Sequence, residues 1–322
     1  MIDIELLRNG DRKTLAKAIT LLESSRKDHR AEAEKLLGDV SVYSGSSIRI
    51  GLTGVPGVGK STLIEALGNY VISQGHRIAV LAVDPSSTLS GGSILGDKTR
   101  MQTLAVNPDA FIRPTPAGGS LGGVARRTRE SIVLCEVAGF DVIVVETVGV
   151  GQSETLVSEM TDLFLLMLLP GGGDELQGIK RGIMELADIV VINKADGELV
   201  ARANLSAADV QQALRLIKPR HQQWQVPVRT ASAQENTGII ELWDSIEEFR
   251  KTLRVDNQFD IDRKNQARSW LWVETRELLL SRFRDDAQIK QSLEDLQQQV
   301  MDGEILPATA ASRLVSEFLD KP

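Results

Sequence analysis

Long apolar runs alternate with segments of helical periodicity through the middle of the chain. Most of these runs are nearly continuous in Val, Ile and Leu, as expected of strands that are buried on both faces. They cover residues 47–53, 77–84, 141–147, 162–169 and 188–194, and a last strand is predicted over 227–232. This alternation predicts the α/β class, with a mostly parallel central sheet flanked by helices.

Both ends of the chain have helical patterns and no strand signal. Residues 3–38 predict two helices, with a break near Gly10. The tail over 257–322 is rich in Gln, Glu, Arg and Leu, and predicts two or three helices with an interruption near Gly303 and Pro307. We therefore expect helical extensions on both sides of the sheet domain.

Composition narrows the classes of partner. The net charge of −7 disfavours a nucleic-acid backbone as the main partner, because such binding needs concentrated Lys and Arg. The single cysteine, Cys135, excludes a disulfide within one chain and is typical of a reducing cytoplasm. The N-terminus lacks a signal-peptide pattern, and no apolar run reaches the ~18 residues of a membrane span. We expect a cytoplasmic protein with neither a nucleic-acid nor a membrane partner.

A phosphate-binding loop follows the first predicted strand. Residues 54–61, GVPGVGKS, match the pattern GxxxxGK[ST] and precede a helical run, as the mechanism requires. Lys60 would supply charge to the β- and γ-phosphates, and the Ser61 hydroxyl would ligate Mg²⁺ at the positive end of the helix. A chance glycine-rich turn is the alternative, which the flanking strand and helix disfavour. The expected phosphate-binding residues are Gly54, Val55, Pro56, Gly57, Val58, Gly59, Lys60, Ser61 and Thr62.

The nucleotide base is indicated by the sequence NKAD at the end of another predicted strand. The Asp196 carboxylate can accept hydrogen bonds from the guanine ring N–H and 2-amino group, which adenine lacks. Lys194 can pack its stem on the base, and Asn193 can tie this loop to the phosphate-binding loop. Ser232 and Ala233, after the last strand, could add backbone contacts. A strand that ends in an ordinary polar turn is the alternative.

Two acids end apolar strands at the same expected edge of the sheet. Asp84 and Glu146 are therefore candidate Mg²⁺ ligands beside Ser61, and candidate catalytic residues together with Lys60. The alternative role for each acid is to cap the helix or turn that follows.

A γ-phosphate sensor is predicted just after Glu146. The backbone N–H of Gly149 could contact this phosphate and order a switch loop. The next position, where Ras-like proteins carry a water-orienting glutamine, is Val150, and no arginine finger is identifiable. We expect slow intrinsic hydrolysis of GTP that a partner accelerates.

Three longer segments resemble the MeaB/ArgK family of GTPases, within the SIMIBI class of P-loop proteins. They are VDPSSTLSGGSILGDKTRM, ETVGVGQSE and PGGGDELQGIKRGIMELAD. The resemblance covers nearly the whole chain. It implies a homodimeric G-protein chaperone of adenosylcobalamin-dependent methylmalonyl-CoA mutase, which gates cofactor loading and protects the mutase from inactivation.

The resemblance also implies roles for residues in these segments. It supports Mg²⁺ and phosphate contacts at the Ser, Asp and Glu positions named above, and makes Asp97 a second acid that moves with the nucleotide state. Asp174, Gln177 and Lys180 would form a third switch that signals to the mutase. By composition alone, residues 171–182 are equally compatible with a glycine-rich loop before a solvated helix.

The tail carries apolar residues that pack either on their own subunit or, as the resemblance suggests, partly against a dimer mate. They are Trp270, Trp272, Leu278, Leu279 and Phe283. Together these patterns divide the chain into an N-terminal helical extension (1–44), a P-loop GTPase domain (45–256) and a C-terminal helical dimerisation arm (257–322).

Rival functions remain open. Older descriptions of the family speak of an ATPase or kinase coupled to lysine, arginine and ornithine transport, against which the guanine-reading motif argues. A nickel-insertion GTPase would need His or Cys clusters, whereas this chain has three scattered histidines and one cysteine. The Asp-x-His-x-x-Gly pattern of cobalamin-binding domains is absent, so we expect GTP or GDP with Mg²⁺ and no directly bound cobalamin.

Overall fold

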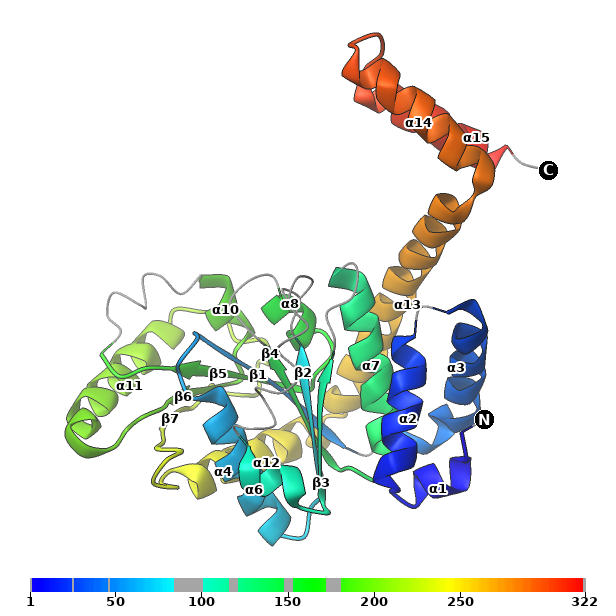
Figure 1. The fold of residues 1–322 in the computed structure, drawn as a ribbon. Helices are drawn as coiled ribbons and strands as arrows, with labels where there is room; N and C mark the ends of the chain where they lie inside the picture. The colour runs from blue at the N-terminus through cyan, green and yellow to red at the C-terminus, as the bar shows by residue number, and fades with distance from the viewer. Residues whose placement is uncertain are drawn as a thin grey trace. The chain divides into compact units, whose positions relative to one another are not determined.

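The protein divides into two compact units, a sheet unit (Met1–Gln266) and a helical unit (Ala267–Pro322). The computed structural model describes residues 2–24, 26–45, 47–83, 101–115, 121–147, 153–171 and 181–320. Figure 1 shows the order of the elements along the chain. Among the described residues, no helix is long and apolar enough to cross a membrane.

The sheet unit is built on one parallel sheet, as the alternating pattern predicts. Its strand order is β3-β2-β4-β1-β5-β6-β7, and every neighbouring pair is parallel. The strands are β1 (Ile48–Gly54), β2 (Ile78–Val83), β3 (Ala110–Thr115), β4 (Val142–Thr147), β5 (Leu163–Leu168), β6 (Ile189–Ile192) and β7 (Val228–Thr230). The α/β fold class is confirmed.

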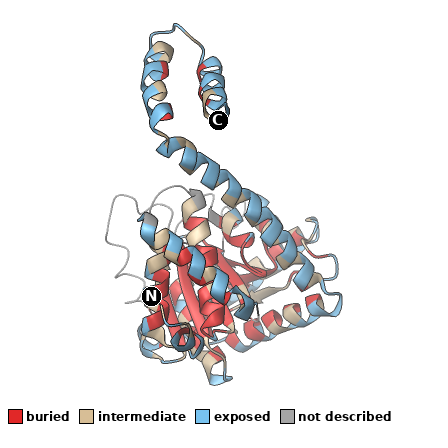
Figure 2. Ribbon diagram, turned by 90° about the vertical axis from the view of Figure 1, so that its right-hand side faces the viewer, coloured by how far each residue is buried: buried red, intermediate tan, exposed pale blue. Residues whose placement is uncertain are grey.

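Helices cover both faces of this sheet, so that its central strands are buried on both sides (Figure 2). One apolar cluster joins the sheet to α4, α6, α11 and α12, and the other joins it to α1, α2, α3, α7 and α8. The N-terminal helices thus share a core with the sheet. The helices of this unit are α1 (Ile4–Arg8), α2 (Arg12–Glu23), α3 (Lys27–Val40), α4 (Lys60–Ser73), α6 (Gln102–Val106), α7 (Leu121–Val137), α8 (Ser153–Ser158), α10 (Arg181–Leu186), α11 (Val200–Leu214) and α12 (Ile239–Val255), with 3₁₀ turns η1 (Ser41–Tyr43) and η3 (Gly197–Leu199).

Three strands share one feature at their start, an aspartate directly before the first strand residue. Asp141, Asp162 and Asp188 each accept a backbone N–H at the start of a neighbouring strand. The donors are Arg77 to Asp141 at 2.8 Å, Arg49 to Asp162 at 2.8 Å and Phe164 to Asp188 at 2.9 Å. These bonds satisfy amides at the amino edge of the sheet and fix the register of adjacent strands.

Two features differ from the expectation. Strand β3 was not predicted, because AFIRPT is short and contains Pro114, which cannot donate to a ladder. The strand is tolerated because it lies at the edge of the sheet, where β2 is its one neighbour among the described strands. The N-terminal region holds three helices where two were predicted, since the chain breaks again between Glu23 and Lys27.

Helix α13 (Gln258–Asp285) begins in the sheet unit and continues into the helical unit. The helical unit also holds α14 (Ala287–Met301) and α15 (Pro307–Leu319), which pack as a hairpin around Ile289, Leu296 and Leu314. Phe283 at the end of α13 contacts Phe318 with ring centroids 5.3 Å apart. The predicted interruption of the tail near Gly303 and Pro307 is therefore present.

Candidate functional site

The phosphate-binding loop joins β1 to α4, as its motif predicts. Gly59 precedes the first residue of α4 with a φ of 96°, a left-handed conformation that L side chains rarely adopt. A β-carbon placed on Gly59 would lie 2.6 Å from the side-chain nitrogen of Asn193. Both the backbone angle and the close approach of Asn193 therefore require glycine at this position.

The charged and hydroxyl groups of the loop lie at the start of α4. Lys60 Nζ donates a hydrogen bond to the carbonyl oxygen of Gly54 at 2.8 Å, which holds the ammonium across the loop. Ser61 is nearly buried in the first turn of α4, whereas Thr62 is exposed. Val58 is fully buried and anchors the loop in the core. The N-terminal amides of α4 and the Lys60 ammonium thus create a site that favours an anion.

Asn193 connects three loops that are far apart in sequence. Its side-chain nitrogen donates to the Val58 carbonyl at 2.8 Å, and its side-chain oxygen accepts the backbone N–H of Ala233 at 3.3 Å. The residue is only 2% exposed, so both bonds form in a dry environment where losing a partner is costly. The phosphate loop, the NKAD loop and the loop after β7 are therefore held as one body.

Asp196 is fixed by the loop after β7. Ser232 Oγ donates to Asp196 Oδ2 at 2.5 Å and itself accepts the backbone N–H of Glu235 at 3.1 Å. Lys194 adopts a φ of 60°, an uncommon conformation for a non-glycine residue, as the chain turns out of β6. Sequence reasoning gave Ser232 only a backbone role and missed this side-chain bond. No sequence signal marks a serine side chain that bonds a carboxylate 36 residues away.

Glu146 lies at the carboxyl end of β4, in register between Leu52 of β1 and Ala82 of β2. Side chains alternate along a strand, so Glu146 shares a face with Val144, the face that α4 covers. Its side chain is buried, with 4% exposed. The structure thus places this acid at the same edge and on the same face as the start of α4.

A second polar pair lies beneath the phosphate loop and was not predicted. Thr147 Oγ1 donates to Thr53 Oγ1 at 2.9 Å, and both residues are buried. This bond joins the end of β4 to the residue that precedes the loop, which helps to fix Glu146 relative to β1.

Several predicted site residues lie outside the described residues. They are Asp84, Asp97, Gly149, Asp174, Gln177 and Lys180. Asp84 directly follows Val83, the last residue of β2, which pairs with Thr147. Among the described residues, the structure brings together the phosphate loop, Asn193, Asp196, Ser232 and Ala233 at one edge of the sheet.

Comparison with known proteins confirms the family resemblance. The sequence model of the family described as "Methylmalonyl Co-A mutase-associated GTPase MeaB" matches residues 15–288. A protein of Mycobacterium tuberculosis named as a probable GTPase is 54% identical over 309 residues, covering 96% of this chain and 92% of the relative. The mouse protein "Methylmalonic aciduria type A homolog, mitochondrial" is 45% identical over 322 residues, covering 97% of this chain and 78% of the relative. A crystal structure described as "LAO/AO transport system kinase" superposes with a TM-score of 0.77 at 38% identity, covering 99% of this chain and 96% of that one.

Proposed function

This chain belongs to the MeaB family of methylmalonyl-CoA mutase-associated GTPases, and we propose that it is a GTP-hydrolysing chaperone of that mutase. In this role it gates adenosylcobalamin loading and protects the mutase from inactivation, and it binds no cobalamin itself. The observation that carries the nucleotide part is the fixed position of Asp196 beside the phosphate loop. The client part rests on the family and on the mouse relative's name.

Guanine selectivity follows from the fixed carboxylate. Asp196 can accept from the guanine ring N–H and 2-amino group, while Ser232 already donates to one of its oxygens. Adenine offers no donor on that edge, so bound ATP would leave a carboxylate poorly paired and desolvated. A site built to bond a donor discriminates strongly against an analogue that lacks it.

The residues at the sheet edge fit a hard divalent cation such as Mg²⁺. The Ser61 hydroxyl and the Glu146 carboxylate are oxygen donors, and both lie at the α4 side of the sheet edge. We propose that Asp84, next after β2, completes this set. Bound Mg²⁺ would neutralise charge on the terminal phosphates, while Lys60 and the α4 amides hold the phosphate oxygens.

Hydrolysis is proposed to be slow in the isolated protein. Val150 has no polar group that can orient a water molecule, and it stands where Ras-like proteins carry glutamine. A partner that orders the neighbouring segment would raise the rate. The proposed switch residues Asp97, Gly149, Asp174, Gln177 and Lys180 would report the nucleotide state to that partner.

We further propose a homodimer formed through the C-terminal helices, in the cytoplasm. Within the single chain, α13 exposes Leu271, Trp272 and Leu279, with Trp272 72% exposed. Large apolar side chains on one exposed helix are typical of an interaction surface. Phe283 does not belong to this surface, because it packs on α15 of its own chain.

The rival function is a kinase or ATPase coupled to transport of lysine, arginine and ornithine. It is suggested by the description of the crystal structure that superposes on this chain. The position of Asp196 disfavours it, since a kinase or ATPase of this kind would have to bind adenine.

The decisive experiment measures GTP turnover by the purified protein, alone and with an adenosylcobalamin-dependent methylmalonyl-CoA mutase. We expect slow turnover that rises at least about tenfold with the mutase, and no displacement of bound GDP by excess ATP. Turnover that is unchanged by the mutase, with no complex formed, would refute the chaperone role. Displacement by equimolar ATP would favour the transport-coupled rival.

A further inference from the structure

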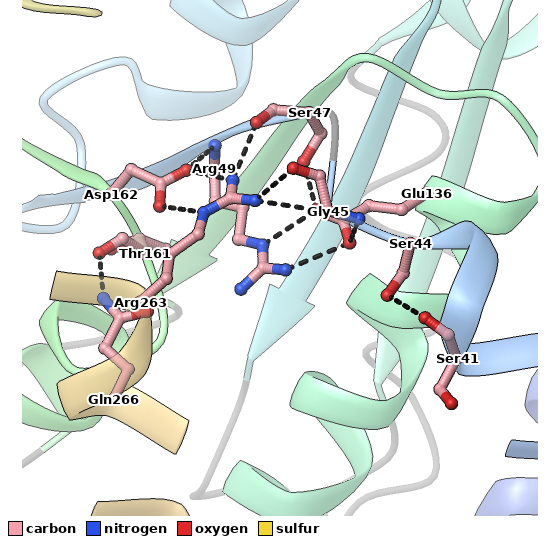
Figure 3. Close-up of polar contacts among 10 residues, drawn as sticks. All are labelled: Ser41, Ser44, Gly45, Ser47, Arg49, Glu136, Thr161, Asp162, Arg263 and Gln266. Carbon is pink, nitrogen blue, oxygen red and sulfur yellow. Dashed lines mark hydrogen bonds and ion pairs between the residues drawn. The ribbon is translucent and has the colours of Figure 1, made fainter. Parts of the chain in front are cut away.

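The root of α13 is fixed to the amino edge of the sheet by one guanidinium group. Arg263 donates to both oxygens of Asp162 through Nε and Nη2, at 2.8 and 2.7 Å (Figure 3). The same group donates to the carbonyl oxygens of Gly45 and Ser47, each at 2.7 Å. One turn later, Gln266 donates to the Thr161 carbonyl at 2.8 Å.

A second arginine and a buried glutamate complete the cluster. Glu136 accepts from Arg49 through Nε and Nη2, each at 3.0 Å, from Ser47 Oγ at 2.5 Å and from the Gly45 N–H at 2.8 Å. Its carboxylate is fully buried and lies 3.8 Å from Arg263. The cluster therefore contains two cations and two anions, carried by α13, β1, the end of α7 and the residue before β5 (Figure 3).

Within this cluster the Glu136 carboxylate is held in its charged form. Burial by itself would raise the pKa of Glu136, but Arg49 and Arg263 hold that pKa below its ordinary value. Because Glu136 is fully buried, separating it from Arg49 and Arg263 would leave a buried charge without its partners, which is costly. We therefore expect the elements that carry these groups to move together.

Each element that meets Arg263 has its other end at the nucleotide edge. β1 starts at the cluster and ends in the phosphate loop at Gly54. α7 connects β3 to β4, so it begins at the carboxyl edge and ends at Glu136. α8 lies between β4 and β5 in the chain, and Asp162 follows it directly before β5. β1, α7 and the connection from α8 to β5 thus all lead from the nucleotide edge to residues that contact Arg263 or Gln266 of α13.

We propose that Arg263 is a positioning residue that couples the nucleotide edge of the sheet to the start of α13. The proposal rests on the guanine-nucleotide binding argued above. When GDP is exchanged for GTP, any shift of α7 or of the α8–β5 connection moves Glu136 or Asp162. Because one guanidinium group holds Asp162 and the backbone before β1, α13 moves with them. The helix that begins here continues into the helical unit, so the signal has a covalent path out of the sheet unit.

The test compares Arg263→Gln with Lys264→Gln in the full-length protein. Lys264 is the next residue on the same helix and is exposed, so its substitution makes the same charge change without touching the cluster. Hydrogen exchange of the backbone amides of 258–266 is measured with GDP and with a non-hydrolysable GTP analogue. The dissociation constants of both nucleotides are measured on the same samples.

We expect exchange in 258–266 to differ between the two nucleotides in the wild type and in Lys264→Gln, and the difference to vanish in Arg263→Gln. Coupling is reciprocal, so the ratio of the two dissociation constants shifts by roughly fivefold or more in Arg263→Gln. A role confined to stability would weaken folding and leave this ratio unchanged. If Arg263→Gln does not fold, Gln266→Leu replaces it, with a partial loss of the exchange difference expected.

An exchange difference that survives in Arg263→Gln, or one that is absent from the wild type despite tight binding of both nucleotides, would overturn the coupling. If Gln266→Leu has to replace Arg263→Gln, an undiminished exchange difference in Gln266→Leu would also overturn the coupling. Failure of the wild type to bind guanine nucleotides at all would overturn the proposed function, and the coupling with it.

Discussion

Ser232 holds the Asp196 carboxylate across 36 residues of sequence with a hydrogen bond of 2.5 Å. Ser232 is fully buried and Asp196 is partly exposed, so the buried hydroxyl orients a carboxylate that solvent can reach. In the proposed function, the remaining lone pairs of this carboxylate would accept hydrogen bonds from a guanine base. The pair would then link the loop after β7 to base selection.

Ser232→Ala is expected to weaken GTP binding by roughly tenfold, because one hydrogen bond that orients the carboxylate is worth about 1 kcal/mol or slightly more. Ser73→Ala is the matched control, since Ser73 is exposed and its hydroxyl bonds to Tyr70 and Gln74 at the end of α4. Calorimetric titration with GDP checks both variants. Equal affinity of the two variants would contradict the role given to Ser232.

Asp196→Asn is expected to exchange guanine for xanthine selectivity. The amide keeps an acceptor for the ring N–H, but its NH₂ group opposes the guanine 2-amino group and matches the carbonyl that xanthine has there. We expect GTP affinity to fall by at least about a hundredfold, and XTP affinity to rise above it. Competition between the two nucleotides for the variant measures this. Retained preference for GTP would show that Asp196 does not contact the base.

Gly59→Ala separates a steric effect from backbone strain. Its β-carbon would overlap Asn193, whereas Gly75, with a similar φ of 89°, has no neighbour within 4 Å of such a carbon. Both alanine variants should lose about 1–2 kcal/mol of stability through the left-handed backbone. Only Gly59→Ala should also lose nucleotide binding, by about tenfold or more, because Asn193 must move. Thermal unfolding and nucleotide titration of both variants test the distinction.

Asp188 and His221 form a buried pair whose titrations oppose each other. Burial raises the pKa of Asp188 to about 7, against the attraction of Arg220, and burial lowers the pKa of His221 to about 4. His221 lies 3.5 Å from Asp188 and 3.6 Å from Asp262. The native state therefore retains a proton on Asp188 that the unfolded chain releases, and lacks one on His221 that the unfolded chain binds.

The sign of each contribution follows from these shifts. Asp188 makes stability fall as pH rises from about 4 to 7, whereas His221 makes stability fall as pH drops from 6.5 towards 4. The two slopes nearly cancel in the wild type. The substitution Asp188→Asn removes the contribution of Asp188 and leaves that of His221. As pH is lowered from 6.5, the free energy of unfolding of this variant should therefore fall by up to about 1.4 kcal/mol per pH unit relative to wild type. Urea unfolding across pH 4.5–7.5 measures the slopes, and parallel profiles would contradict the pairing.

Trp272→Glu is expected to convert the proposed dimer to a monomer without changing GTP affinity, because it places a charge at the most exposed aromatic position of α13. Ser269→Glu adds the same charge at another exposed position of the helix and serves as the control. Light scattering at micromolar concentration reads the mass. A wild-type monomer would refute the dimer, and a dimeric Trp272→Glu would place its interface elsewhere.

The sequence by itself determined the class of fold, and it predicts the chemistry of the two candidate nucleotide-binding loops. Strands such as β4 and β5 can be predicted because they are nearly continuous in apolar residues. GVPGVGKS and NKAD can be recognised because the functional groups of each motif lie within a few consecutive residues. The edge strand β3 was not predicted from the sequence. Its position at the edge of the described sheet, which makes Pro114 acceptable, is a property of the tertiary structure and not of the local sequence.

Tertiary structure alone decided which distant groups meet. Asn193 reaches Val58 across 135 residues, and Arg263 reaches Asp162 across 101. The residues that flank Asn193 or Arg263 in the sequence do not indicate which distant residue it contacts. Such contacts depend on the order of the strands and on which helix end faces which strand start. The apolar periodicity of the chain predicts the helices and strands. The side chains that connect these elements can be identified only from the packed structure, because packing decides which of them lie side by side.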